Sequence, residues 1–313
     1  MKTKILIVTG PTASGKTDLA IRIAEKNNGE IISADSMQIY RHMNVGTAKP
    51  SRSEMKKIEH HLIDVIDPDQ PFSVADFRNK SEEIIQKIQD KGKLPIIAGG
   101  TGLYINSLVK PWTFSNTPPS DERRSELQKT FEEKGGEYLY SMLESVDPES
   151  AKSIHPNNVK RVMRALEVYM VSGVKKSIQD EESQKNETPY EPVMIGLNMD
   201  RELLYDRIDK RVDIMLEQGL VAEVRGLIEM GYSKDLVSMQ GLGYKEIVKY
   251  LSGEWSYEHS VYILKRDTRR FAKRQLTWFR RYDEIKWFYI DAYEDKEALY
   301  ADVFDYLNER NII

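Results

Sequence analysis

The segment Gly10–Thr17 has residue types and a spacing that suit phosphate binding. Its sequence, GPTASGKT, fits the pattern G-x-x-x-x-G-K-[ST] and lies between an apolar run and a helical pattern. Glycines let backbone N–H groups approach phosphate oxygens, and the start of the helix adds partial positive charge. Lys16 would neutralise a phosphate, and the Thr17 hydroxyl is placed for Mg²⁺. The segment therefore predicts a P-loop that wraps a phosphate or diphosphate.

Two more polar groups follow predicted strands. Asp35 comes directly after a short apolar strand, where its carboxylate fits three roles: Mg²⁺ binding, proton transfer, or an ordinary turn. Thr101 lies within Gly99–Gly102, whose glycines also suit a plain strand-to-helix turn. If this turn lies beside the P-loop, Thr101 is a candidate for ligand contact.

Basic residues form two additional candidate groups. Arg207 and Arg211 lie four positions apart on one face of a predicted helix, where they fit either a phosphate clamp or surface ion pairs with Asp206 or Asp209. The segment 265–281 holds eight Lys and Arg residues and one acid, although the net charge of the chain is −4. Because solvated helices usually mix charges of both signs, this stripe predicts contact with a polyanion.

The elements that must position these groups alternate between strand and helix. Apolar runs predict strands at 5–8, 30–34 and 94–98, and helical spacing predicts helices at about 16–26 and 73–90. This alternation is typical of an α/β fold with a parallel sheet, in which ligands bind at the carboxyl ends of the strands. We therefore expect the P-loop, Asp35 and Gly99–Gly102 to converge.

The middle of the chain lacks strand signals. Turn residues and two adjacent prolines at 112–119 interrupt the alternation, and helical patterns then continue up to a polar tract at 179–192 that predicts a loop. A strand returns at 193–197, and we expect helices from there to the end. The prediction is a P-loop NTPase-like (nucleotide-kinase-like) core formed by 1–114 and 191–313, with an all-helical insertion domain at 115–190.

Composition restricts the class of protein. Of 313 residues, 40% are hydrophobic and 31% charged, as in ordinary soluble globular proteins, and no apolar run approaches the length of a membrane helix. The chain has no cysteine, which excludes disulfides and thiolate metal sites and fits a cytoplasmic location. His60 and His61 lack a metal-binding spacing, so we expect a packed or hydrogen-bonded pair.

Seven segments, taken together, resemble the bacterial tRNA dimethylallyltransferases, also called tRNA isopentenyltransferases. The segments are GPTASGKT, ISADSMQIYRHMNVGTAKP, HHLID, GGTGLY, NVKRVMRALE, QGLGYKE and KRQLTWFR. The match runs in order from Leu6 to about Arg281. Each segment alone is weak, but seven in register are specific. The chain resembles the bacterial form, because the cysteine-containing zinc finger of eukaryotic relatives is missing.

The resemblance implies a reaction and its participants. A dimethylallyl group would move from dimethylallyl diphosphate to the exocyclic N6 amine of the adenosine immediately 3′ of the anticodon in tRNA. The P-loop would hold the leaving diphosphate with Mg²⁺, Asp35 would accept the amine proton, and Lys16 and Thr101 would take part in catalysis. The target base would have to leave its stack. The default oligomeric state is a monomer.

The motifs and the resemblance together give two sets of candidate residues. Diphosphate binding is expected from Gly10, Pro11, Thr12, Ala13, Ser14, Gly15, Lys16, Thr17, Arg207 and Arg211, with Thr17 as the metal ligand. Contacts with tRNA are expected from Asp35, Ser36, Met37, Gln38, Thr101, Arg123, Lys160, Arg161, Val162, Met163, Arg164, Gln240, Gly241, Leu242, Gly243, Tyr244, Lys245, Arg269, Lys273 and Arg274. The helical insertion would clasp the anticodon stem.

Three alternative functions explain part of the sequence. A nucleotide or nucleoside kinase would use the P-loop and the paired arginines but leave the basic stripe without a role. An adenylate isopentenyltransferase that acts on free nucleotides would need no large helical clasp. A non-enzymatic nucleic-acid-binding regulator would give Asp35 no role.

Overall fold

The computed structural model describes residues 2–110, 117, 120–185 and 187–313. Two compact units are formed, the larger by Met1–Val109 and Pro189–Ile313 and the smaller by Lys110–Thr188. The turn expected at 112–119 and the domain boundary expected at 114 and 115 lie outside the described residues, apart from Thr117.

The larger unit is built on six parallel strands in the order β3-β2-β4-β1-β5-β6. The strands are β1 (Thr3–Thr9), β2 (Gly29–Ser33), β3 (His60–His61), β4 (Leu94–Gly99), β5 (Tyr190–Asn198) and β6 (Ile285–Tyr289). The predicted parallel α/β sheet is confirmed. The expectation of helices alone after residue 197 is wrong, because β6 pairs with β5 at the edge of the sheet.

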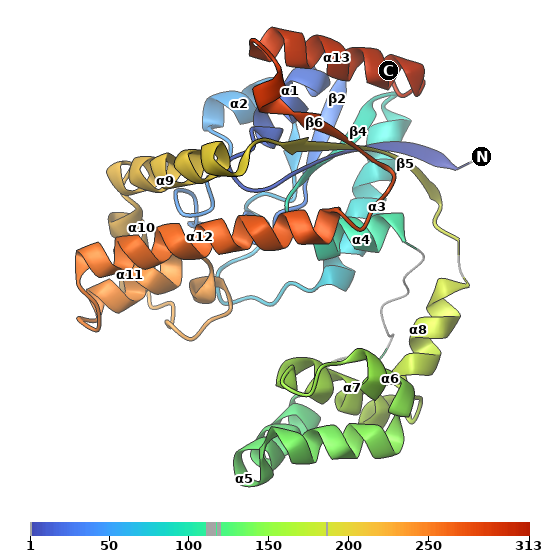
Figure 1. Cartoon of the computed structure of the whole chain (residues 1–313), viewed down its shortest axis with the longest axis vertical. Helices are drawn as coiled ribbons and strands as arrows, with labels where there is room; N and C mark the ends of the chain where they lie inside the picture. The colour runs from blue at the N-terminus through green and yellow to red at the C-terminus, as the bar shows by residue number, and fades with distance from the viewer. Residues whose placement is uncertain (1, 111–116, 118–119, 186) are drawn as a thin grey trace. The chain divides into compact units, whose positions relative to one another are not determined.

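Helices cover both faces of this sheet, which explains why its strands are apolar on both sides (Figure 1). Leu6 and Val8 face the helices α1 (Lys16–Lys26) and α13 (Lys296–Glu309) in one core. Ile5 and Ile7 belong to the other core, with α3 (Val74–Asp90), α4 (Gly102–Val109) and the helices that follow β5.

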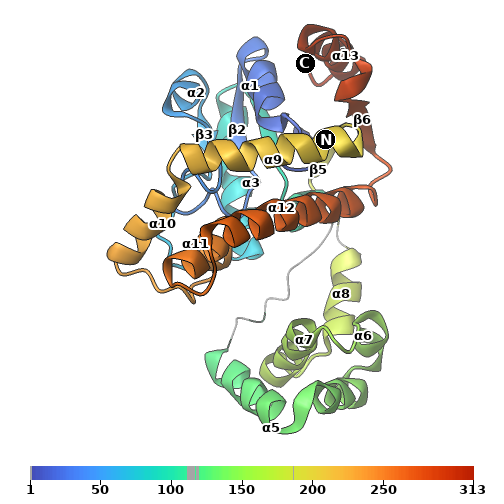
Figure 2. The ribbon, with the colours of Figure 1, turned by 60° about the vertical axis from the view of Figure 1, so that its left-hand side comes forward.

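The helices after β5 form a layer next to the carboxyl ends of the strands. They are α9 (Arg201–Glu217), α10 (Leu220–Glu229), η1 (Ser238–Gln240), α11 (Tyr244–Leu251) and α12 (Tyr257–Phe279). In this layer α12 packs between α9 and α11 and also contacts α4 (Figure 2). Two short elements, α2 (Arg52–Lys57) and η2 (Ile290–Ala292), complete the larger unit.

Every regular element in the described part of the smaller unit is a helix. The unit contains α5 (Asp121–Val146), α6 (Pro148–Ser153), α7 (Val159–Ser172) and α8 (Lys176–Gln184) around a core that includes Leu139, Leu143 and Leu166. The loop expected at 179–192 is shorter than predicted. Its first part lies in α8, and its last part, from Tyr190, pairs with β1.

A search of the described helices finds none with the length and apolar character that a membrane span requires.

Candidate active site

The P-loop joins β1 to α1 and depends on two glycines. A Cβ on Gly10 (φ 148°) would lie 2.5 Å from the carbonyl oxygen of Leu197. Gly15 (φ 85°) is the N-cap of α1 in the left-handed region. The Ser14 hydroxyl is buried and has no hydrogen-bond partner among the described residues. The loop therefore leads into a helix N-terminus and keeps a buried polar group unsatisfied, both of which suit an anion.

Lys16 places a cation inside this loop. Its Nζ donates to the carbonyl oxygen of Pro11 at 3.2 Å. Burial and the nearby Arg211 lower the pKa of Lys16 to about 8, although Asp35 acts in the opposite direction. In the free protein, burial therefore destabilises the charged form of Lys16, and a bound anion would stabilise that form.

Two arginines of α9 approach the P-loop from the same helix face. The Nη2 atom of Arg207 lies 3.8 Å from the place where a Cβ on Gly15 would stand. Burial lowers the pKa of Arg211, while Asp35 raises it. Among the described residues neither arginine forms an ion pair with Asp206 or Asp209, and the Asp209 carboxylate instead lies 2.6 Å from Nη1 of Arg269. The phosphate clamp stays a prediction.

Asp35 and Thr101 lie on two neighbouring strand ends that are joined directly. The amide of Thr101 donates to the carbonyl oxygen of Ala34 at 3.0 Å, and its Oγ1 accepts from the amide of Ser36 at 3.0 Å. Asp35 Oδ1 accepts from the amide of Met37 at 2.9 Å, so the carboxylate also serves the turn. The turn role and a chemical role are compatible, because Asp35 also lines the cavity described next.

These groups line one cavity of about 770 Å³ at the carboxyl ends of the strands. Its walls include Lys16, Thr17, Asp35, Thr101 and Arg211. The predicted convergence of the P-loop, Asp35 and the glycine turn is therefore confirmed.

The sequence alone did not reveal Gln275 of α12. Its Oε1 accepts from the amide of Thr12 at 2.9 Å, and its Nε2 donates to the carbonyl oxygen of Gly100 at 3.0 Å. The side chain is buried and leaves no room for a Cβ on Gly100, which would lie 2.1 Å from Nε2. One amide thus ties the P-loop to the turn that holds Thr101. The one available signal was a lone glutamine in a basic helix.

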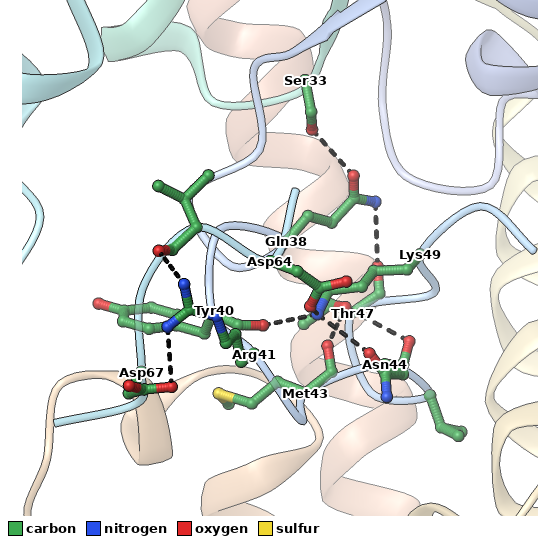
Figure 3. A network of polar contacts seen from close by, with 12 residues as sticks. Ser33, Gln38, Tyr40, Arg41, Met43, Asn44, Thr47, Lys49, Asp64 and Asp67 are labelled. Carbon is green, nitrogen blue, oxygen red and sulfur yellow. Dashed lines mark hydrogen bonds and ion pairs between the residues drawn. The ribbon is translucent and has the colours of Figure 1, made fainter. Parts of the chain in front are cut away.

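Another wall of the cavity is a folded loop, residues 36–50, which a polar network holds in place (Figure 3). Ser33 Oγ donates to Gln38 Oε1 at 2.9 Å, and Gln38 Nε2 donates to the carbonyl oxygens of Thr47 and Ala48 at 3.4 Å. The Nζ of Lys49 lies 2.5 Å from Asp64 Oδ1, and its side chain is only 4% exposed. Gln38 is therefore positioned by the end of β2 and by its own loop.

The segment 240–245, which is expected to contact tRNA, lies against this wall. Some of its residues line the cavity, and others are buried in the core. Leu242 and Lys245 line the cavity. A Cβ on Gly241 would lie 2.4 Å from Cε of Met37, so the two segments touch there. Tyr244 is fully buried and cannot contact tRNA directly, which corrects the expectation for this residue.

Packing against α9 alters the interpretation of the basic stripe on α12. Arg269 pairs with Asp209, and Nζ of Lys265 lies 2.6 Å from Asp213. These two cations therefore already have partners on a neighbouring helix, and the tRNA contact of Arg269 stays a prediction. Lys273 and Arg274 remain exposed, and Arg274 lines the cavity.

The residues of the smaller unit that are expected to bind tRNA differ in exposure and in their partners. Lys160 and Arg161 are exposed at the start of α7. Val162 is fully buried in the core of the unit, so a direct contact is excluded for it. Arg164 Nη1 donates to Glu167 Oε2 at 2.8 Å, and Arg123 Nη1 donates to Glu126 Oε2 at the same distance. Arg164 and Arg123 thus already have partners inside the unit.

The histidine pair is hydrogen-bonded, as predicted. His60 Nδ1 lies 2.7 Å from the carbonyl oxygen of Ile58, and His61 Nε2 lies 2.8 Å from Glu30 Oε2. Glu30, Glu59 and His61 lie close enough to hold a metal ion. However, the ammonium groups of Lys91 and Lys93 already lie 2.9 and 2.8 Å from Glu30 Oε1. Two cations at one carboxylate leave little attraction for a third.

Comparison with known proteins supports a single family. The family model described as IPP transferase matches residues 38–282. A tRNA dimethylallyltransferase from Acetivibrio thermocellus is 54% identical over 303 residues, which is 97% of each chain. The chain belongs to the IPP transferase family. A second relative of the same name, from Clostridioides difficile, is 50% identical over 98% of each chain.

Solved structures of the IPP transferase family have the same fold. A tRNA isopentenylpyrophosphate transferase from Staphylococcus epidermidis matches with a TM-score of 0.73 and 43% identity, over 99% of this chain and 100% of that one. A eukaryotic dimethylallyltransferase, described as acting on tRNA, matches with a TM-score of 0.78 and 31% identity, over 88% of this chain and 70% of that one. The resemblance drawn from seven segments is confirmed.

Proposed function

We propose that this IPP transferase moves a dimethylallyl group from dimethylallyl diphosphate to the N6 amine of the adenosine immediately 3′ of the anticodon in tRNA. The observation that carries the proposal is the shared cavity. The P-loop with Lys16, the guanidinium-bearing Arg211 of α9 and a carboxylate-bearing residue, Asp35, all line it. A leaving diphosphate and an attacking amine need these two kinds of group.

The cationic side of the cavity suits the donor. Lys16, Arg207 and Arg211 would bind the diphosphate together with the P-loop amides. As the allylic C–O bond breaks, its electron pair leaves with the diphosphate, where negative charge grows. Fixed cations and N–H groups stabilise such developing charge more than water does, since they need no reorganisation.

The other side of the cavity suits the acceptor. The N6 lone pair forms the new C–N bond, and the amine proton passes to the carboxylate of Asp35. An adenine amine is a poor nucleophile, so its placement matters as much as the base. We assign that placement to Thr101, whose backbone is tied to the strand end that carries Asp35.

We also propose Mg²⁺ as the cofactor, since the cavity offers hard oxygen donors. Thr17, whose hydroxyl is the expected ligand, lines it, and the acidic cluster near β3 is already neutralised by lysines. Mg²⁺ prefers such oxygens and keeps several waters or substrate phosphates as its remaining ligands. When bound, it would supply additional charge to the leaving diphosphate.

The tRNA itself needs a basic surface outside the cavity. Lys273 and Arg274 of α12 and Lys160 and Arg161 of α7 are exposed, and we assign them to tRNA phosphates. We further propose that the helical unit clasps the anticodon stem and that the enzyme acts as a cytoplasmic monomer. Light scattering of the purified chain tests the oligomeric state.

The decisive experiment compares acceptors. The enzyme is incubated with labelled dimethylallyl diphosphate and Mg²⁺, and with unmodified tRNA or AMP as acceptor. A parallel reaction contains ATP and nucleosides. We expect prenylated tRNA and no phosphoryl transfer. Phosphorylated nucleoside without prenylated tRNA would refute the proposal. Equal rates of prenylation of AMP and tRNA would indicate that the acceptor is a free nucleotide.

A further inference from the structure

Glu223 of α10 forms a fourfold hydrogen-bonded junction that the mechanism above does not use. Its Oε2 accepts from the amides of Asn44 and Val45, both at 2.8 Å. Its Oε1 accepts from the amide of Gly46 at 3.0 Å and from the hydroxyl of Tyr244 at 2.7 Å. Three successive N–H groups form an anion-binding concavity of the kind that usually receives a ligand, and here a side chain from 177 to 179 residues away fills it.

The junction joins two segments that line the cavity. The loop side continues from Gly46 to Thr47 and Ala48, whose carbonyl oxygens accept from the side chain of Gln38. The second segment is 240–245, in which Tyr244 is the first residue of α11. A Cβ on Gly46 would lie 2.6 Å from the ring of Tyr244, so the two segments are in close contact as well as linked through the carboxylate.

We propose that Glu223 is a positioning residue for the acceptor side of the cavity: its carboxylate fixes the wall that receives the tRNA base. The inference rests on the proposed function. None of the four hydrogen bonds of Glu223 involves a P-loop residue, so its substitution should leave diphosphate binding unaffected.

The chemistry requires a carboxylate at this place. All four partners are donors, two to each oxygen. A glutamine would keep one oxygen for the amides of Asn44 and Val45 and turn an NH2 group toward the other two partners. The hydroxyl of Tyr244 could accept from this NH2 group, but the amide N–H of Gly46 could not, which loses one hydrogen bond and adds a repulsive contact. Glu223→Gln is therefore a strong perturbation of charge and donor balance with almost no change in size.

The test uses three variants of the full-length enzyme and one control. Glu223→Gln removes the charge, Tyr244→Phe removes one donor, and Gly46→Ala pushes the two segments apart without changing any charge. Glu229→Gln, at an exposed position of the same helix, is the matched control. For each we measure kcat/KM for tRNA, the Kd of pyrophosphate, the melting temperature, and hydrogen exchange of the peptide 43–47.

For Glu223→Gln we expect kcat/KM for tRNA to fall by about tenfold to hundredfold, as for other lost charge-assisted hydrogen bonds. The Kd of pyrophosphate should stay within about twofold, and amides 44–46 should exchange faster. Tyr244→Phe and Gly46→Ala should show the same selectivity, with smaller losses for Tyr244→Phe. The control should match the parent.

Two results would overturn the inference. One is equal loss of pyrophosphate affinity and tRNA turnover across the three variants, as a general loss of stability would produce. The other is unchanged tRNA turnover in Glu223→Gln. A parent enzyme with no activity on tRNA would instead refute the proposed function. If Glu223→Gln fails to fold, Tyr244→Phe, which removes one of the four hydrogen bonds, decides between these outcomes.

Discussion

Binding of pyrophosphate should weaken about tenfold between pH 7 and pH 9, because Lys16 loses its proton in the free enzyme over this range. Burial and the neighbouring Arg211 lower the pKa of Lys16 to about 8. A bound diphosphate, with its negative charge, restores the protonated form. The protonated fraction of free Lys16 is about nine-tenths at pH 7 and about one-tenth at pH 9, which gives the tenfold loss, or about 1.4 kcal/mol.

The same shift predicts the sign of a stability effect. Since the pKa of Lys16 lies below its ordinary value of 10.5, the unfolded chain binds more protons than the folded one between about pH 8 and 10.5. Stability from this group therefore rises with pH across that window. At pH 7 the charged Lys16 costs up to about 3 kcal/mol, and Lys16→Met should recover part of it in the free enzyme.

Calorimetric titration with pyrophosphate, in two buffers of different ionisation enthalpy, measures both the affinity and the protons taken up. We expect uptake of about half a proton at pH 8 that is absent in Lys16→Arg, because a guanidinium stays protonated. The titration of pyrophosphate itself is common to both proteins and cancels in the comparison. Equal pH slopes in the two proteins, together with no stability gain in Lys16→Met, would refute the reasoning.

Three further predictions concern the rest of the site. Asp35→Asn should lower kcat by about 10²- to 10⁴-fold, as expected for the loss of a general base, while the Kd for tRNA measured by fluorescence anisotropy stays unchanged. A variant that binds tRNA weakly but keeps its kcat would contradict the chemical role of Asp35. Arg274→Glu should lower the slope of the logarithm of the tRNA association constant against log salt by about one or more. Arg269→Glu should mainly lower the melting temperature, because Arg269 already pairs with Asp209 of α9. Equal salt slopes in the two variants would mean that tRNA does not bind at Arg274. Gln275→Leu leaves the amide of Thr12 without its acceptor, so pyrophosphate binding should weaken by about five- to fiftyfold in the same titration. An unchanged Kd would mean that the P-loop keeps its conformation without Gln275.

Local patterns predicted the parts of the fold that local physics determines. A β-branched run followed by a glycine-rich turn and a helix gave the P-loop, because that order is needed to bring backbone amides to an anion. The parallel arrangement of three predicted strands then required their carboxyl ends to share one edge. The meeting of Lys16, Asp35 and Thr101 in one cavity followed from this topology.

What escaped prediction depends on contacts between distant segments. The strand Ile285–Tyr289 lies at the edge of the sheet, where it pairs with β5, a segment far away in the sequence. The charge of Lys265 is cancelled by Asp213, 52 residues away, so a count along one helix overstated the free basic surface. Gln275 and Glu223 likewise reach partners more than 170 residues away, and no local pattern marks them.

The position of α12 explains why the donor and acceptor sides can work together. Gln275 points inward and joins the P-loop to the turn of Thr101, while the adjacent Arg274 is exposed at the cavity. A tRNA phosphate drawn to Arg274 would thus bind one residue away from the amide that orders the diphosphate loop. If this helix couples the two substrates, pyrophosphate should strengthen tRNA binding in the parent enzyme and lose that effect in Gln275→Leu, since coupling between two sites is reciprocal and needs a shared element. Equal coupling in both proteins would show that the two sides act independently.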